Sequence, residues 1–343
     1  MKEFHIGDRK ISPETPPFII AEAGINHEGD FNKAIQLVDA AIESGADCIK
    51  FQCHITEKEM IPTDMKPGEI SDERLWDIIK RCELTEDEEI KIKAYCEKRG
   101  ILYLCTPFSK EAADRLFEMN VEAFKIGSGE CNNIPLVEHI SEMGKPIILS
   151  TGMNDLESIS KSVSVMNKKS VPIMLMHCTS MYPTPYDKVR LNAIKELYDT
   201  FGLPVGLSDH SIGIYTCLGA IPFGACVFEK HFTLTRKWTG PDISISIEPH
   251  ELSELVKGSK AIFQALHGNK TILPEEKPVI DFAYASVVSI KPIKKGETFS
   301  LNNLWVKRPG TGNFLAYEID KIFGKKASKD IENNSQILLT DIE

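Results

Sequence analysis

The polar residues from which we first infer the fold and the site lie in one stretch, Val227-Phe-Glu-Lys-His-Phe-Thr-Leu-Thr-Arg-Lys-Trp-Thr-Gly-Pro-Asp242. A short β-prone run, residues 225–228, leads directly into the charged group at 229–231, and a polar loop follows. The same pattern occurs earlier, where the apolar run 204–207 leads into the polar group at 208–210. Because strands that end in closely spaced polar residues commonly face a site, we expect both strand ends to face the same one.

Each of these strand ends delivers a histidine, His210 and His231. For either histidine alone a place in the core is the ordinary alternative, but their matching positions favour two imidazoles aimed at one divalent cation. Two imidazoles without a thiolate or carboxylate form an exchangeable site, which suits Mn²⁺ better than a structural zinc, with Mg²⁺ and Co²⁺ as further candidates. Such an ion would polarise a carbonyl group as a Lewis acid.

The composition is that of an ordinary soluble globular protein of 343 residues, with 42% hydrophobic and 26% charged residues. Neither a membrane-length apolar run nor a signal-peptide pattern occurs. The nine cysteines form no Cys-x-x-Cys pair, which favours reduced thiols in the cytosol over disulfides or a zinc ribbon. A net charge of −10 argues against nucleic-acid binding, and any bound anion must be held by local groups.

Strands and helices alternate through most of the chain. Residues 18–23 form a buried strand, 31–44 have helical spacing after a possible N-cap at Asp30, and 48–52 form the next strand. Further strands are expected at 101–105, 123–126, 146–149, 173–176, 204–207 and 225–228, and further helices at 73–82, 85–99, 110–119, 134–143, 156–167, 187–201, 214–223 and 251–266. Eight strand–helix units in about 250 residues predict a (β/α)₈ TIM barrel over residues 1–268.

A doubly wound sheet is the alternative fold. Its first turn would carry a glycine-rich nucleotide fingerprint, which Gly24-Ile-Asn-His-Glu-Gly29 matches poorly. Before the first barrel strand, residues 1–17 are polar and contain prolines, which predicts a hairpin or an arm. After the barrel, residues 269–283 read as a polar linker, and residues 284–343 as a small, mostly β domain with little core of its own. We expect that domain to dock on a barrel of another subunit.

The expected carboxyl ends of the strands offer a set of polar side chains: Glu22, Lys50, Gln52, Thr106, Lys125, Ser128, Ser150, His177, Ser208, His210 and His231. The two lysines with the three serine hydroxyls predict a site for a phosphate or carboxylate, to which the backbone of Gly127–Gly129 and Gly152 would add donors. Schiff-base formation by one lysine is the competing chemistry. Glu22 is a candidate base or charge stabiliser, and an ion pair with one lysine is the compatible alternative.

Eight ordered segments together resemble the sialic acid synthase family. They are Ile20-Ala-Glu-Ala-Gly-Ile-Asn-His-Glu-Gly29, Phe124-Lys-Ile-Gly-Ser-Gly-Glu-Cys-Asn-Asn133, Ser150-Thr-Gly-Met153, Tyr182-Pro-Thr-Pro185, Gly206-Leu-Ser-Asp-His-Ser211, Glu229-Lys-His-Phe-Thr233, Gly240-Pro-Asp242 and Val306-Lys-Arg-Pro-Gly310. These enzymes join phosphoenolpyruvate to an N-acetylated amino sugar. The resemblance implies a metal-dependent barrel with a carboxyl-terminal domain similar to type III antifreeze protein, a SAF-like β-clip, in a domain-swapped homodimer.

The resemblance also implies roles for single residues. The residues that match the phosphoenolpyruvate contacts are Lys50, Lys125, Ser128, Ser150 and Ser208, and Ser180 stands at the position of a further phosphate contact. His210 and His231 match metal ligands, and Glu22 matches the acidic residue near the reacting centre. Gln52, Tyr182 and Asp242 match the sugar site, and Phe282 and Arg308 match residues at the junction with the partner's small domain. Ser180 departs from the family, because many members have Asn there.

The segments do not agree on one amino sugar. The loop 233–239 looks like that of legionaminic acid synthases, which use a 2,4-diacetamido-2,4,6-trideoxymannose, whereas Gly127–Asn133 and Ile280–Ser286 look like the neuraminate branch. We interpret the chain as an N-acetylneuraminate synthase acting on N-acetylmannosamine, with the legionaminic acid synthase as the alternative. A non-catalytic carbohydrate-binding or ice-binding protein is the other class, but it gives the strand-end lysines, serines and histidines no role.

Overall fold

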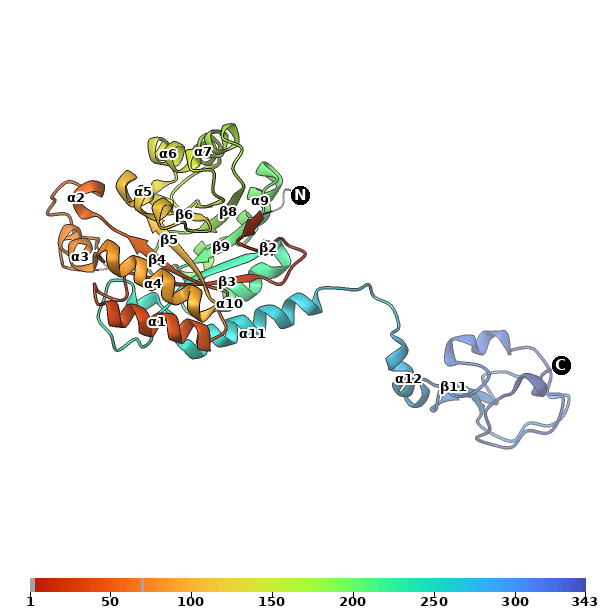
Figure 1. Ribbon diagram of the computed structural model, residues 1–343. Coiled ribbons are helices and arrows are strands. Elements are labelled where there is room, and N and C mark those ends of the chain that lie inside the picture. Colours follow the sequence, from red (N-terminus) through yellow and green to blue (C-terminus); the bar gives the residue numbers. More distant parts are fainter. Residues whose placement is uncertain (1–3, 69–70) are drawn as a thin grey trace. The chain divides into compact units, whose positions relative to one another are not determined.

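The computed structural model describes residues 4–68 and 71–343. Residues 1–3 of the expected amino-terminal hairpin and residues 69–70 of the loop after the second barrel strand lie outside these ranges. The chain divides into two compact units, Met1–His267 and Gly268–Glu343 (Figure 1).

The first unit is built on eight parallel strands. They are β3 (Phe18–Gly24), β4 (Cys48–Cys53), β5 (Leu102–Pro107), β6 (Phe124–Ile126), β7 (Ile147–Ser150), β8 (Ile173–Cys178), β9 (Val205–Asp209) and β10 (Val227–His231). Hydrogen bonds join them in the order β5-β4-β3-β10-β9-β8-β7-β6, and the two end strands, β5 and β6, contact each other. The sheet is therefore a nearly closed barrel, and the predicted (β/α)₈ fold is confirmed.

Helices surround these strands, as Figure 1 shows. They are α1 (Phe31–Glu43), α2 (Thr56–Glu59), α3 (Leu75–Cys82), α4 (Glu86–Arg99), α5 (Lys110–Glu118), α6 (Ile134–Glu142), α7 (Leu156–Lys168), α8 (Tyr186–Val189), α9 (Asn192–Phe201), α10 (Tyr215–Ala220) and α11 (Pro249–Ala265). Local sequence explains several of their starts. Asp30 caps α1 by accepting from the backbone of Asn32 and Lys33, and Thr85 and Glu88 form a capping box at α4.

Several boundaries shift by a residue or two from the sequence-based prediction, and three of the differences have a clear local cause. The helix expected at 187–201 is two helices, α8 and α9, because Arg190 adopts a left-handed backbone with φ of 56°, which a right-handed helix cannot include. The helix expected at 214–223 ends at Ala220 and continues as a 3₁₀ turn, Ile221–Phe223, which contains a proline. The last strand, β10, continues beyond residue 228 to His231, because its charged residues find buried partners.

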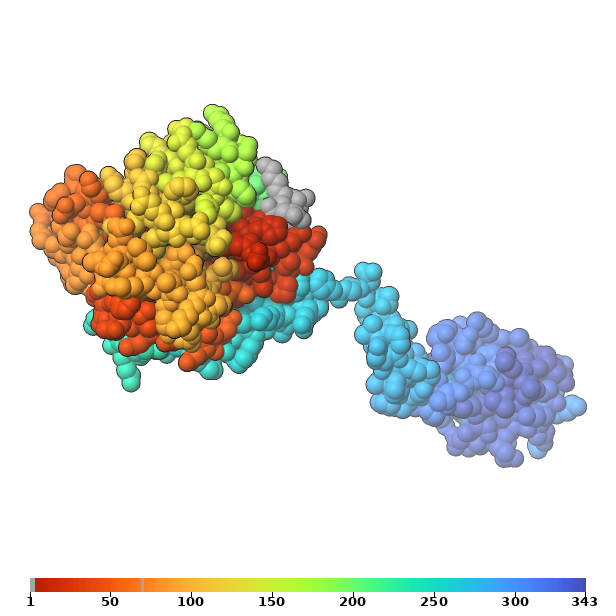
Figure 2. All heavy atoms as spheres, in the orientation of Figure 1, coloured from red at the N-terminus to blue at the C-terminus, as the bar shows by residue number. Residues whose placement is uncertain are grey.

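An amino-terminal hairpin closes the end of the barrel opposite the site. It consists of β1 (Phe4–Ile6) and β2 (Arg9–Ile11), paired antiparallel. Its three buried apolar side chains, Phe4, Ile6 and Ile11, form one core cluster with residues at and near the amino-terminal ends of the barrel strands. In the space-filling view the hairpin, in red, sits against the barrel (Figure 2). The predicted hairpin is thus confirmed over its described residues, and it fills the bottom of the barrel.

The second unit contains a small antiparallel sheet, β11 (Ser286–Ser289) paired with β12 (Leu304–Lys307). Part of the expected linker is helical, because α12 spans Lys277–Ala283. The expectation of little core was wrong, since a compact set of buried apolar side chains fills the unit: Val287, Ile293, Phe299, Leu304, Ile322, Ala327, Ile331 and Ile337. Short bridges between loops, rather than long strands, bring these side chains together.

None of the described helices is both long and apolar enough to cross a bilayer. The nine cysteines are all buried as free thiols. Burial raises the pKa of several of them, to about 11 for Cys131 and about 12 for Cys96, so these thiols stay protonated at neutral pH and are weak nucleophiles.

The hairpin's contribution to stability can be measured with a matched pair of substitutions. Ile11 is 1% exposed in the barrel floor, whereas Ile61 is 81% exposed. We expect Ile11→Ala to lower the free energy of unfolding by about 2–5 kcal/mol, because it leaves a cavity, and Ile61→Ala to change it by less than about 0.5 kcal/mol. Denaturant unfolding followed by tryptophan fluorescence measures both. Equal effects would show that the hairpin adds no core to the barrel.

Candidate active site

The alternation of side chains along each strand decides which polar groups face the barrel interior. Ser208 and His210 point inward at the end of β9, and Glu229 and His231 do the same at the end of β10. The residues between them point outward, where Lys230 Nζ lies 3.0 Å from Asp209 Oδ2 in a buried ion pair. Because successive residues of a strand face opposite sides, the reactive groups and this structural pair are separated by the sheet.

The inward groups line a cavity of about 320 Å³ at the carboxyl ends of the strands. The predicted site residues that line it are Glu22, Lys50, Gln52, Lys125, Ser128, Ser150, Ser180, Tyr182, Ser208, His210 and His231. Thr106, Phe108, Met153, Cys178 and Glu229 complete its wall together with Gly127 and Gly129. The structure thus brings most of the predicted residues to one place, and it adds groups that the sequence analysis had not assigned.

Both carboxylate oxygens of Glu22 are held by the neighbouring strand β4. Lys50 Nζ lies 2.7 Å from Glu22 Oε2, and Gln52 Nε2 donates to Glu22 Oε1 at 3.0 Å. Lys50 also donates to the hydroxyl of Thr106 at 3.1 Å. Glu22 therefore forms the ion pair with a lysine that the sequence analysis gave as the alternative, and its partner is Lys50.

Glu229 is a charged residue of the cavity wall that the sequence analysis did not assign. Its carboxylate lies between the two buried lysines, 3.7 Å from Lys50 Nζ and 3.9 Å from Lys125 Nζ, and it accepts from Ser208 Oγ at 2.9 Å. The predicted strand ended at residue 228, so Glu229 fell just beyond it and its facing direction was not predicted. Its separation of two residues from His231 was the available signal, because that spacing places both side chains on one face of an extended strand.

Burial and the paired charges shift the pKa values of these groups. Burial raises the pKa of Glu22 to about 7, although the Lys50 ammonium acts in the opposite direction. Burial also opposes ionisation of Glu229, but the ammonium groups of Lys125 and Lys50 hold its pKa below the ordinary value. Burial lowers the pKa of Lys125. The cavity therefore contains two cations beside one firmly ionised carboxylate and one carboxylate that titrates near neutrality.

Hydroxyl groups gather around Lys125 on the other side of the cavity. Lys125 Nζ donates to Ser150 Oγ at 2.5 Å, and the backbone N–H of Gly152 donates to Ser128 Oγ at 3.0 Å. The buried hydroxyl oxygen of Ser180 has no hydrogen-bond partner. A Cβ at Gly152 would lie 2.4 Å from Ser180 Oγ, so glycine leaves the space between these hydroxyls open. An ammonium with several hydroxyl groups around a small space fits a phosphate group.

The two histidines meet the chemical requirements of metal ligands. Their ring centroids are 5.3 Å apart, and His210 Nδ1 lies 3.1 Å from the carbonyl of Thr179, which leaves its Nε2 free to face the cavity. His231 Nδ1 is buried without a hydrogen-bond partner, and burial keeps the pKa of this imidazole well below its ordinary value, so a lone pair is available. Among the described residues no group of three or more protein ligands forms, so water and substrate would complete the coordination.

Two of the residues predicted for the sugar, Tyr182 and Asp242, lie beside these histidines. The Tyr182 ring stacks on His210 with centroids 4.2 Å apart, and Asp242 Oδ2 is 3.5 Å from His231 Nδ1. Burial raises the pKa of Asp242 to about 6. Phe282 and Arg308 belong to the second unit, where Phe282 is exposed on α12 and Arg308 is exposed after β12. Their predicted roles at a partner's site stay predictions.

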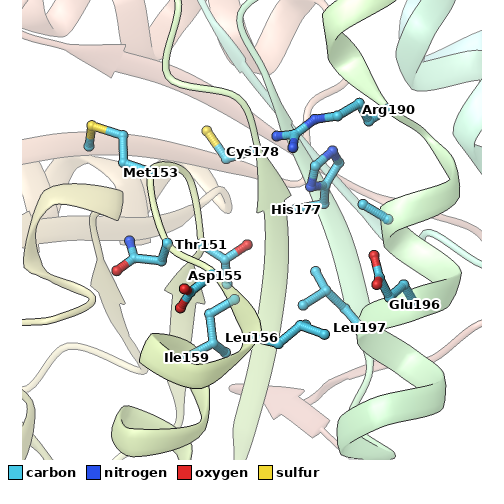
Figure 3. A pocket seen from close by; sticks show the side chains of 12 residues that line it. Thr151, Met153, Asp155, Leu156, Ile159, His177, Cys178, Arg190, Glu196 and Leu197 are labelled. Carbon is cyan, nitrogen blue, oxygen red and sulfur yellow. The ribbon is translucent and has the colours of Figure 1, made fainter.

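His177 is the strand-end residue that does not reach this cavity. It faces outward from β8, and His177 Nε2 lies 2.6 Å from the carbonyl of Val189. It lines a separate pocket of about 410 Å³ between α7 and α9, together with Arg190 and Glu196 (Figure 3). Cys178, the next residue, lines both pockets, so β8 forms the wall between them.

Comparison with known proteins assigns the family. Residues 37–271 match the NeuB family and residues 284–343 match the SAF domain. The chain belongs to the NeuB family. An uncharacterized protein of Methanocaldococcus jannaschii is 42% identical to this NeuB-family chain over 344 residues, covering 100% of this chain and 99% of the relative. The N,N'-diacetyllegionaminic acid synthase of Campylobacter jejuni is 40% identical over 329 residues, and the match covers 93% of this chain and 98% of the relative.

Among solved structures, an N-acetylneuraminic acid synthetase from Leptospira borgpetersenii, in complex with citrate, superposes with a TM-score of 0.73. The two chains are 37% identical, and the match covers 81% of this chain and 95% of the Leptospira chain. The predicted membership of the sialic acid synthase family and the predicted SAF domain of this NeuB-family protein are thereby confirmed.

Glu229 should determine how the site responds to anions. In Glu229→Gln the two lysines lose a shared partner, so we expect the free energy of unfolding to fall by about 2–3 kcal/mol without added anion. Inorganic phosphate should then raise the melting temperature of Glu229→Gln more than that of the wild type, because the anion replaces the missing charge. Thermal unfolding in a phosphate series measures this, with the exposed Glu157→Gln as control. Equal phosphate effects in all three proteins would contradict the assigned position of Glu229.

Proposed function

We propose that the protein is a nonulosonic acid synthase that condenses phosphoenolpyruvate with the open-chain form of an N-acetylated amino sugar. One observation supports this proposal most strongly. A single cavity contains two lysines and several serine hydroxyls as well as two histidines that could bind a metal ion. A phosphate-bearing substrate and a carbonyl substrate would bind side by side in such a cavity. Membership of the NeuB family and the names of its relatives support the same reaction.

In this proposal the lysine side of the cavity binds phosphoenolpyruvate. Lys125, Ser128 and Ser180 would contact the phosphate, and Lys50 and Ser208 would be available to the carboxylate. Because Glu22 and Glu229 already balance these lysines, the substrate would have to share them with the carboxylates. Both reactants would then be held in one orientation, away from most of the solvent, which removes much of the entropic part of the barrier.

The histidine side would bind the sugar. A divalent ion held by His210 and His231 would supply Lewis-acid polarisation of the sugar aldehyde, with Mn²⁺ as the first candidate. Tyr182, Asp242 and Gln52 would orient the sugar beside it. The third carbon of phosphoenolpyruvate forms a bond to the aldehyde carbon, and the aldehyde oxygen takes up a proton.

In this proposal Glu22 acts on the next step. The new bond leaves positive charge at the second carbon of the former enol, and a carboxylate held beside it stabilises that charge or accepts a proton from the attacking water. The resulting tetrahedral species breaks its C–O bond and releases inorganic phosphate, leaving the 2-keto acid. One phosphoenolpyruvate, one aldose and one water thus give one product and one phosphate.

Isotope labelling tests the proposed reaction directly. With ¹⁸O in the bridging C–O–P position of phosphoenolpyruvate, C–O cleavage carries the label into phosphate. We expect labelled phosphate only when an amino sugar and Mn²⁺ are both present, and a chelator should stop its release. Label retained in the keto acid, or phosphate release that does not depend on sugar, would contradict the proposal.

Metal binding by the histidines can be tested separately. Mn²⁺ binding by His231→Ala, followed by electron paramagnetic resonance, should be weaker than that of the wild type by at least about 10-fold.

We propose N-acetylmannosamine as the sugar, which gives N-acetylneuraminate. The legionaminic relative at 40% identity favours a second candidate, the 2,4-diacetamido-2,4,6-trideoxymannose. Replacing a hydroxyl by an acetamido group changes both the size and the hydrogen bonding of the substrate, so the two sugars should differ in kcat/KM by about 100-fold or more. Parallel measurements of kcat/KM assign the sugar, and the higher value decides between these two candidates.

We further propose a homodimer in which the second unit of each chain completes its partner's site through Arg308. A guanidinium can donate a directed hydrogen bond to the N-acetyl oxygen of the sugar. Arg308→Ala should therefore raise KM for the sugar by about 10-fold or more and leave KM for phosphoenolpyruvate nearly unchanged. Steady-state kinetics with each substrate varied in turn measures the difference.

Mixed dimers test the exchange between subunits. In heterodimers of Arg308→Ala with Glu22→Ala chains, one of the two sites would contain both native residues, so about half of the wild-type activity should return. Homodimers of either variant serve as controls. Verified heterodimers without recovered activity would show that Arg308 serves its own barrel or no site.

A further inference from the structure

A chain of hydrogen-bonded side chains leads from the end of α2, through the residue that follows β4, to the carboxylate of Glu22. The two carboxylate oxygens of Glu59 lie 3.1 and 3.0 Å from His54 Nδ1, and His54 Nε2 lies 3.0 Å from Gln52 Oε1. Gln52 Nε2 in turn donates to Glu22 Oε1 at 3.0 Å. Every link is within hydrogen-bond distance, so the four side chains form one continuous relay.

The outer pair of this relay is as buried as the site itself. The side chains of His54 and Glu59 are 3% and 4% exposed, and the His54 ring stacks on Phe108 with centroids 4.5 Å apart. Removing an imidazole and a carboxylate from water costs desolvation free energy that their mutual attraction often fails to recover. A pair of this kind directly behind a reacting carboxylate therefore points to a role in the site rather than to stability alone.

The backbone next to Glu22 leaves room for the relay. A Cβ at position 24 would lie 3.2 Å from Gln52 Nε2 and 3.2 Å from Glu22 Oε1, closer than ordinary van der Waals contact. Gly24 also has a φ of 51°, a conformation that side chains disfavour. The amide of Gln52 reaches Glu22 through space that only glycine leaves open.

The relay determines which atom of the Gln52 amide faces Glu22. An amide can turn by half a revolution, and in the other orientation its oxygen would face an oxygen of the Glu22 carboxyl group in place of a donor. His54 prevents this when both of its ring nitrogens carry a hydrogen, because Nε2–H then donates to Gln52 Oε1 while Nδ1–H donates to the Glu59 carboxylate. The orientation of the last donor thus depends on a carboxylate that lines no part of the cavity.

We propose that Glu59 and His54 are positioning residues for Glu22. They fix the Gln52 amide so that its N–H group holds one Glu22 oxygen, while Lys50 holds the other. The consequence for catalysis rests on the proposed function, in which Glu22 acts beside the reacting carbon. Neither positioning residue would touch substrate.

Glu59→Gln, which retains the size of the side chain, tests the kinetic role. We expect it to lower kcat by about 10-fold to about 100-fold, because a misplaced Glu22 acts after both substrates have bound, and to change the KM for phosphoenolpyruvate by less than about 3-fold. Asp114→Asn is the matched control, because Asp114 Oδ1 lies 2.6 Å from His139 Nε2 in a histidine–carboxylate pair between α5 and α6. It should leave kcat within about 2-fold of the wild type.

A double substitution separates positioning from a merely structural role. If Glu59 acts only through Gln52, then Gln52→Leu and Gln52→Leu/Glu59→Gln should have the same kcat within about 2-fold. A structural defect would instead lower kcat by the same factor in both backgrounds and would overturn the proposal.

Crystal structures of the wild type and of Glu59→Gln give a readout that does not depend on turnover. We expect the Gln52 amide to leave hydrogen-bond distance of Glu22 Oε1 in the variant. An unchanged contact would overturn the relay even if kcat fell. Failure of the wild type to release phosphate with either sugar would refute the proposed function but leave this structural test of the relay intact.

Discussion

Four charged side chains share the mouth of this barrel, and each could be buried there only because the others are present. Glu22 and Glu229 alternate with Lys50 and Lys125, and none of the four has more than a few per cent of its surface exposed. A single such charge would cost several kcal/mol to bury. The strand order makes the balance possible, because β10 and β4 flank β3 and their register sets His231 and Lys50 beside Glu22. Any anionic substrate therefore enters a site whose charges already compensate one another.

The two-residue period of the strands separates chemistry from stability. On β9 and β10 the inward residues line the cavity, while Asp209 and Lys230 point outward and form a buried ion pair behind them. On β8 the same rule turns Cys178 inward and His177 toward the helices. Neighbouring residues in one polar segment consequently serve different purposes, which composition alone does not reveal. The face of the strand must be known before a polar residue can be assigned to a site.

The sequence predicted the barrel and most of the cavity lining, because apolar runs and strand-end polar groups are local features. It did not predict the reach of β10, because three charged residues in succession oppose a buried strand unless their partners are known. Glu229 was missed for that reason, although its spacing from His231 was visible. The sequence offered even less indication of His54 and Glu59, because their importance depends on which side chains they contact in the folded chain. The core of the second unit was missed because loops, not periodic strands, assemble it.

The position of Glu22 depends chiefly on one neighbouring strand. Lys50 and Gln52 are two residues apart on β4, so both point inward and each takes one oxygen of the same carboxylate. Two donors on one rigid strand fix the rotation of the carboxylate more firmly than donors on separate loops would. The same strand leads directly into His54 and α2, whose last residue is Glu59. A change in the conformation of that segment can therefore reach Glu22 through the hydrogen bonds of His54 and Gln52, although neither His54 nor Glu59 lines the cavity.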